Sequence, residues 1–104
     1  MGDPSPDLNA LEERWRRRVL DARLRLELAR NRLNEIENAL AVGGIPLPDG
    51  SFEHLRALRT ERLALSKYRV ILRLFTALVL SGKIPDEAEW LREPSETDGY
   101  EDWL

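Results

Sequence analysis

Apolar residues recur along the first third of the chain in a regular alternation of four and three positions. The series is Trp15, Val19, Ala22, Leu26, Ala29, Leu33, Ile36 and Leu40. This spacing draws one apolar stripe along a helix, as in coiled coils, and no proline interrupts it. The pattern predicts a helix from about residue 9 to about residue 41, preceded by a flexible lead-in at residues 1–8. Asn9 and Glu12 have the spacing of a capping box at its start.

The segment "VGGIPLPDG", residues 42–50, breaks this pattern. Its two adjacent glycines suit the left-handed conformation that often ends a helix, and its prolines do not continue one. Ser51, which follows, is a favourable N-cap residue. We therefore expect a loop at 42–50, a second helix at about 51–81, and an antiparallel, coiled-coil-like hairpin over residues 9–82.

The second helix changes character along its length. In its first half, we expect three leucines to face the first helix: Leu55, Leu58 and Leu65. From Tyr68 to Leu80, in contrast, apolar side chains occupy most of the circumference and leave one polar stripe, which contains Arg69, Arg73 and Thr76. This apolar arc is about twice as wide as one partner helix can bury.

The first helix has a similar excess, because Leu20, Leu24 and Leu28 form a second apolar row outside the heptad stripe. Exposed apolar surface of this extent favours association, so we expect a homodimer or a larger complex, most simply a four-helix bundle made of two hairpins. The expected interface residues are Leu20, Leu24, Leu28, Tyr68, Val70, Ile71, Leu74, Phe75 and Leu78. The alternative is that Trp90 and Leu91 fold back and cover the excess within one chain.

Residues 83–104 follow Gly82, which is expected to end the second helix. The segment "PDEAEWLR" predicts a short amphipathic turn or helix that begins at Pro85, and the rest is an acidic tail. Residues 1–85 contain 15 basic and 11 acidic side chains, whereas residues 86–104 contain one basic and eight acidic ones. A basic body is thus followed by an acidic extension.

The tail ends in "DGYEDWL". We expect Tyr100, Trp103 and Leu104 to form its contacts, because aromatic side chains and a terminal carboxylate are typical of short peptides that are captured in a groove. Such a tail docks on a partner protein or on the hairpin of its own chain, or it has no binding role. The sequence leaves these three alternatives open.

The arginines of "RWRRR" are the strongest indication of nucleic-acid binding: Arg14, Arg16, Arg17 and Arg18. Clustered guanidinium groups neutralise phosphates. Carboxylates are interspersed with these arginines, however, so an ordinary solvated helix surface explains them better. Trp15 belongs to the heptad stripe, and we expect it in the core and not stacked on a base.

Composition excludes several function classes. The 104 residues allow one domain, and the absence of cysteine excludes disulfides and thiolate chemistry. His54 is the only histidine, and no glutamate precedes it by three positions as in the metal sites of helical bundles. We therefore expect no catalytic residues, no cofactor and no metal. The start of the chain does not resemble a secretory signal, and the apolar run from Val70 to Leu80 is shorter than a membrane span, which predicts a cytoplasmic protein.

The sequence thus predicts an all-α hairpin with a short C-terminal helix and an acidic tail. The expected function is a non-enzymatic protein–protein interaction module, and the alternative is an accessory nucleic-acid-binding protein. The length and the hairpin superficially resemble small type VII secretion substrates. Those proteins carry Trp-x-Gly between their helices, which "GGIPLPDG" does not, so the sequence is assigned to no family.

Overall fold

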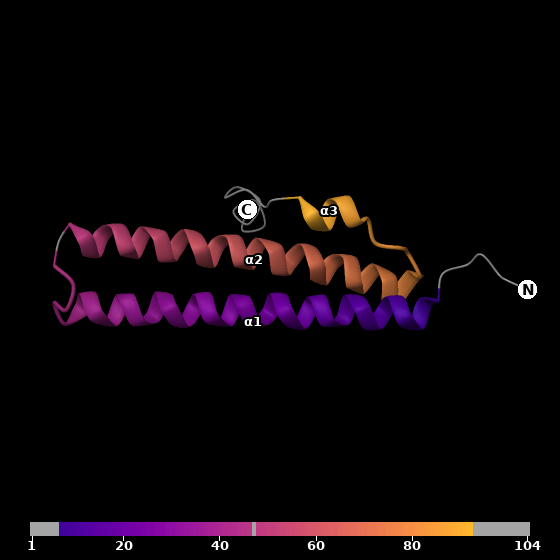
Figure 1. The fold of residues 1–104 in the computed structure, drawn as a ribbon, viewed down its shortest axis with the longest axis horizontal. Coiled ribbons are helices and arrows are strands. Elements are labelled where there is room, and N and C mark those ends of the chain that lie inside the picture. Colours follow the sequence, from indigo (N-terminus) through magenta and orange to yellow (C-terminus); the bar gives the residue numbers. More distant parts are fainter. Residues whose placement is uncertain (1–6, 47, 93–104) are drawn as a thin grey trace, which may run out of the picture.

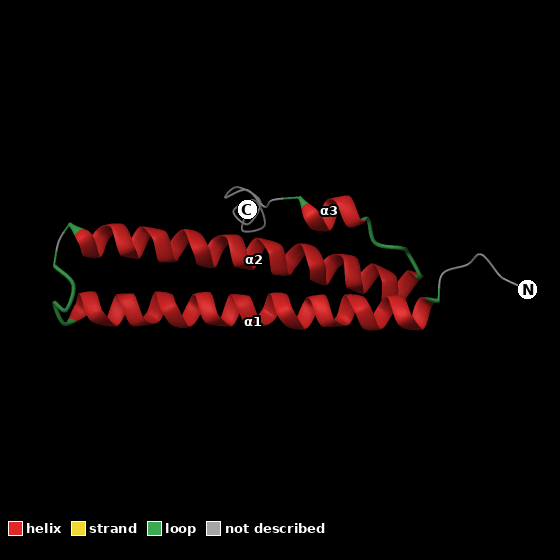
Figure 2. Ribbon diagram, in the orientation of Figure 1, coloured by secondary structure: helices red, strands yellow, loops and turns green. Residues whose placement is uncertain are grey.

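The computed structural model describes residues 7–46 and 48–92, and all regular structure within them is helical. Helix α1 comprises Leu8–Ala41, α2 comprises Asp49–Ser81 and α3 comprises Glu87–Leu91. The two long helices run antiparallel, side by side, and α3 lies alongside the last part of α2 (Figures 1 and 2). None of the helices in this part of the chain is both long enough and apolar enough to cross a bilayer.

The heptad stripe of α1 faces α2, as predicted. Its buried members are Trp15, Ala22, Leu26, Ala29 and Ile36, and its remaining members are partly buried. At the end of the hairpin opposite the loop, Ile71, Leu74 and Leu78 of α2 pack into one core cluster with Trp15 and Ala22. The largest buried side chains are therefore concentrated at this open end.

The first half of α2 faces α1 through alanines. Ala57 is buried, whereas Leu55 is 63% exposed, so the expectation that Leu55 faces inward was wrong. The reason is the register: Ala57, Ala64 and Ile71 are seven residues apart and share one face of α2. Leu55 lies two positions before Ala57, which turns it by about 200° around the helix.

The start of α1 also differs from the expected capping box. Asp7 is the N-cap, and its Oδ1 accepts hydrogen bonds from the backbone N–H groups of Asn9 and Ala10 at 3.0 and 3.3 Å. Asn9 is therefore already helical. Helix α2 likewise begins before the predicted Ser51, because Pro48 occupies its N-cap position without a capping side chain.

The end of α2 and the start of α3 set the direction in which the chain returns. Gly82 ends α2 in a left-handed conformation with a φ of 66°, which agrees with the prediction. Helix α3 begins at Glu87 and not at the predicted Pro85. Asp86 is its N-cap, because its carboxylate accepts from the N–H of Ala88 at 2.9 Å. Of the two residues proposed to fold back, Trp90 packs on the core while Leu91 stays 70% exposed.

Candidate functional site

A row of three leucines on α1 remains outside the hairpin core. Leu20, Leu24 and Leu28 are 57, 54 and 59% exposed. They are spaced by four residues and therefore align along one side of the helix. Leu24 lies midway between the buried Ala22 and Leu26, so the row points away from α2. Nothing in the described part of the chain covers it.

Ion pairs border this leucine row on both sides. Arg25 contacts Asp21 at 3.1 Å on one side, and Arg23 contacts Glu27 at 3.2 Å on the other. All four side chains are more than half exposed. The row is thus a narrow apolar strip between two borders that each carry one acidic and one basic group.

The other predicted interface residues lie elsewhere. Ile71, Leu74 and Leu78 are buried in the hairpin core, and Tyr68, Val70 and Phe75 are partly buried against it. The apolar excess of α2 is therefore largely taken up by α1 and by Trp90. Within α2, the exposed large apolar side chains that remain near its end are Leu72, Val79 and Leu80.

The arginines at the start of α1 are all paired with carboxylates. Arg14 and Arg18 contact the same residue of α3, Glu87, at 3.1 and 3.0 Å. Arg16 and Arg17 contact Glu13, one turn earlier on α1, at 3.5 and 3.8 Å. Two of the four candidate phosphate contacts, Arg14 and Arg18, thus attach α3 to α1. The other two, Arg16 and Arg17, form local ion pairs on the surface of α1.

Trp90 attaches α3 to both long helices. Its ring meets that of Trp15 edge-on, with centroids 6.2 Å apart and planes inclined by 67°. The Arg18 guanidinium lies 4.5 Å from the Trp15 centroid and 5.7 Å from that of Trp90. Lys67 Nζ lies 4.1 Å from the Trp90 centroid and also donates to the Trp90 carbonyl. One further ion pair joins Arg73 to Glu89.

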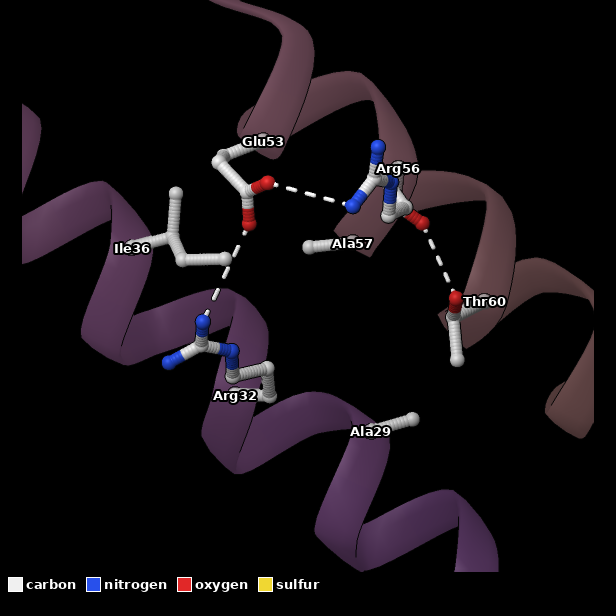
Figure 3. Close-up of a pocket in the computed structure, with 7 residues that line it drawn as sticks. All are labelled: Ala29, Arg32, Ile36, Glu53, Arg56, Ala57 and Thr60. Carbon is white, nitrogen blue, oxygen red and sulfur yellow. Dashed lines mark hydrogen bonds and ion pairs between the residues drawn. The ribbon is translucent and has the colours of Figure 1, made fainter. Parts of the chain in front are cut away.

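A groove between α1 and α2 continues beyond Trp90 toward the loop, and it widens into two hollows. The nearer hollow, of about 380 Å³, is lined by Asp21, Ala22, Arg25, Leu63, Ala64, Lys67 and Trp90. The farther hollow, of about 300 Å³, is lined by Ala29, Arg32, Ile36, Glu53, Arg56, Ala57 and Thr60. In Figure 3 the methyl groups of Ala29 and Ala57 face the space between the helices, and Glu53 links Arg32 and Arg56 across its edge.

The two hollows belong to one groove because they are related by a heptad shift on both helices. Ala29 and Arg32 follow Ala22 and Arg25 by seven residues, and Ala57 precedes Ala64 by seven. Positions seven apart return to the same face of packed helices. The groove stays open at these levels because alanine side chains are short. The prediction from sequence missed the groove, although alanines recurring at heptad positions of both helices were a signal for it.

The remaining predicted residues do not join these surfaces. The His54 imidazole lies near the loop, with Nε2 at 3.1 Å from Glu37 Oε2. Within residues 7–46 and 48–92, no three metal-binding side chains come together. The expected tail contacts Tyr100, Trp103 and Leu104 lie outside the described residues.

No protein-family model, curated protein or solved structure matches this chain.

Proposed function

We propose that this protein is a non-enzymatic protein–protein interaction module, an adaptor, regulator or small subunit of a complex. It binds through the row of Leu20, Leu24 and Leu28 and through its acidic C-terminal tail, and it acts as a homodimer or within a larger complex. The observation that carries the proposal is the alignment of three half-exposed leucines on a face that the hairpin does not use. The absence of cysteine suits work in the reducing cytoplasm.

The leucine row supports binding of limited strength. Full burial of a leucine stabilises by about 1.5–3 kcal/mol, and about half of each side chain is still exposed. Three leucines therefore contribute about 3 kcal/mol when a partner covers them. Association costs at least about 4 kcal/mol in lost freedom. A second contact, such as the tail, is needed before the complex is tight.

The borders of the row suit a second copy of the same chain. In an antiparallel pair related by a twofold axis near Leu24, Asp21 of each copy faces Arg25 of the other. On the opposite border Arg23 faces Glu27 in the same way. An interface between identical copies must be self-complementary, and these charges meet that requirement. Because the leucines form a ridge with a spacing of four, two such ridges favour helices crossing at about −50°.

Sedimentation of the full chain over a range of concentrations tests the proposal. The wild-type chain is expected to be a dimer or larger at low micromolar concentration, and the triple change of Leu20, Leu24 and Leu28 to Gln is expected to give a monomer. A matched control changes three exposed apolar residues of α2 outside the row to Gln: Leu55, Val79 and Leu80. The proposal is overturned if the wild type is monomeric throughout and the leucine changes leave capture of partner proteins unaltered.

The second candidate function is accessory nucleic-acid binding by Arg14, Arg16, Arg17 and Arg18. It is favoured by one observation: three of these side chains, Arg14, Arg16 and Arg17, are more than half exposed despite their ion pairs. The change Glu87→Gln weakens the competing contact to Arg14 and Arg18. Salt-sensitive binding to duplex DNA or RNA that strengthens in this variant, measured by fluorescence polarisation, would favour this candidate over the first.

A further inference from the structure

The groove between α1 and α2 is only partly filled, and what fills it shows which chemistry it accepts. At the open end, Trp90 enters beside Trp15 while cationic side chains lie against its ring. Beyond Trp90 the same groove runs on through the two hollows. We propose that these hollows bind the acidic tail of the same chain, residues 93–104, with Tyr100 in the nearer hollow and Trp103 in the farther one.

The heptad register repeats the surroundings of Trp90 at the two hollows. Arg18, which lies against Trp90, is followed by Arg25 and then Arg32 at intervals of seven. At the open end the side chain of α1 beneath Trp90 is Trp15. At the equivalent positions of the two hollows, seven and fourteen residues later, it is Ala22 and Ala29. Each hollow thus keeps an arginine like Arg18, but has an alanine methyl group at the position that Trp15 occupies at the open end. The hollows therefore offer an aromatic ring a cationic neighbour and the space that Trp15 fills at the open end.

The charges of the groove and the tail are complementary. Arg25, Arg32 and Arg56 line the hollows with side chains that are 76, 63 and 76% exposed. Their contacts with Asp21 and Glu53 are ion pairs at the surface, exposed on the arginine side, and such pairs contribute little to stability. The described residues contain 16 basic and 13 acidic side chains, whereas residues 93–104 contain five acidic and no basic ones. A tail of this charge is attracted to a groove with such a rim.

The tail also resembles the segment that already occupies the groove. In α3 the docked Trp90 follows the acidic Glu89 and precedes Leu91. In the tail Trp103 follows the acidic Asp102 and precedes Leu104. The tail therefore repeats the acidic-Trp-Leu sequence of α3, whose tryptophan already lies at the open end of the groove.

The spacing of the two aromatic residues fits the spacing of the hollows. A shift of seven residues along a helix corresponds to about 10.5 Å. Tyr100 and Trp103 are three residues apart, and in an extended polyproline II conformation they lie on the same side, about 9 Å apart. Arg92, the last described residue, lies two positions after Trp90, which lines the nearer hollow. Residues 93–99 are longer than the path to that hollow requires, so in the proposed arrangement they loop outward before Tyr100 enters it, and Trp103 then reaches the farther hollow.

Docking of the tail uses a different apolar surface from the leucine row, which lies on a neighbouring face of α1. The two surfaces share the Asp21–Arg25 pair, which lines the nearer hollow and borders the row. Docking does bear on the proposed function, because a tail held in its own groove has to be released before it contacts a partner. A partner with an acidic, tryptophan-bearing segment would compete for the same groove.

Disulfide trapping in the full chain tests the proposal, since the natural sequence has no cysteine. The trapping variant combines two changes. Thr60→Cys places a thiol at the rim of the farther hollow, and Leu104→Cys places one beside Trp103. In the matched control variant, Asn31→Cys replaces Thr60→Cys. Asn31 is exposed and lies two residues beyond Ala29, so it faces away from the groove at the same level of the hairpin.

We expect the two thiols of the trapping variant to oxidise within one chain about tenfold faster than those of the control variant, because docking raises their effective concentration. Adding Trp103→Ala or raising the salt concentration should slow the trapping variant to the rate of the control, whereas adding Ser95→Ala should not. Equal rates for the two variants would overturn the proposal. So would disulfides formed mainly between chains, which would place the tail in the groove of a second copy.

Discussion

Replacement of Trp90 by alanine tests whether one side chain holds α3 on the hairpin. A helix of five residues is not stable by itself. The contacts of its neighbours Glu87 and Glu89 are partly exposed ion pairs, which contribute little. The attachment of α3 therefore depends mainly on the packing of Trp90 against Trp15 and on the cations beside its ring.

The expected loss follows from the area involved. A fully buried aromatic side chain removes about 150–250 Å² from water, and Trp90 is partly buried. About 100 Å² at about 25 cal/mol per Å² corresponds to about 2.5 kcal/mol, and the cation–π contacts add about 0.5–1 kcal/mol. We expect Trp90→Ala to lower the free energy of unfolding by about 3 kcal/mol.

Urea denaturation at a fixed protein concentration measures this loss, with Leu91→Ala as the matched control. Leu91 is the next residue and is 70% exposed, so its truncation should cost less than about 0.5 kcal/mol. Hydrogen exchange supplies a local readout: the amide of Trp90, which donates to the Asp86 carbonyl at 3.2 Å, should lose protection in the Trp90 variant. Equal effects of the two substitutions would refute the assignment of Trp90 as the attachment of α3.

Four further predictions use the same denaturation assay. Leu78→Ala should lower the free energy of unfolding by about 2–5 kcal/mol, because Leu78 is buried in the core cluster. Leu28→Ala, in the exposed row, should leave the stability of the monomer nearly unchanged. Similar losses for the two variants would contradict the burial pattern. Gly82→Ala should cost about 1–2 kcal/mol through its left-handed backbone alone, since an added Cβ meets no atom within 4 Å; no loss would argue against that conformation. Asp7→Ala should cost about 1 kcal/mol through the lost cap, and an unchanged midpoint would show that the cap is dispensable. Trp15→Phe should cost less than Trp15→Ala, because the Trp15 indole N–H is buried without a hydrogen-bond partner among the described residues; equal costs would mean that the ring contributes nothing.

The two-helix architecture was predictable because its signals are local and repeated. Eight heptad positions on α1 agree on one face, and Gly82 marks the end of α2 without reference to any distant residue. The partner face of α2 was harder, because its first half uses Ala57 and Ala64. Alanine is only weakly apolar, so the prediction relied on the nearby leucines. Leu58 and Leu65 are partly buried, whereas Leu55 lies on the exposed side of the helix.

The candidate sites depend on contacts between residues that are far apart in the sequence. Arg18 and Glu87 are separated by 69 positions, and no periodicity links them. The fold-back of Trp90 could be stated only as one alternative to association. The exposed row of Leu20, Leu24 and Leu28 was predicted because its alignment follows from the geometry of a single helix. The partner that covers the row depends on the surface of another molecule, which this sequence does not describe.

The contact of α3 with the start of α1 has a consequence for synthesis of the chain. The loop closes one end of the hairpin covalently, whereas the other end is closed by Glu87 and Trp90 across Arg18 and Trp15. A ribosome makes α1 before α3, so the first turns of α1 emerge long before the segment that closes over them. Until then the Trp15 side chain lacks part of its cover. The nascent hairpin is therefore most vulnerable to misassociation at its own N-terminal end, and its last described residues complete the packing of its first.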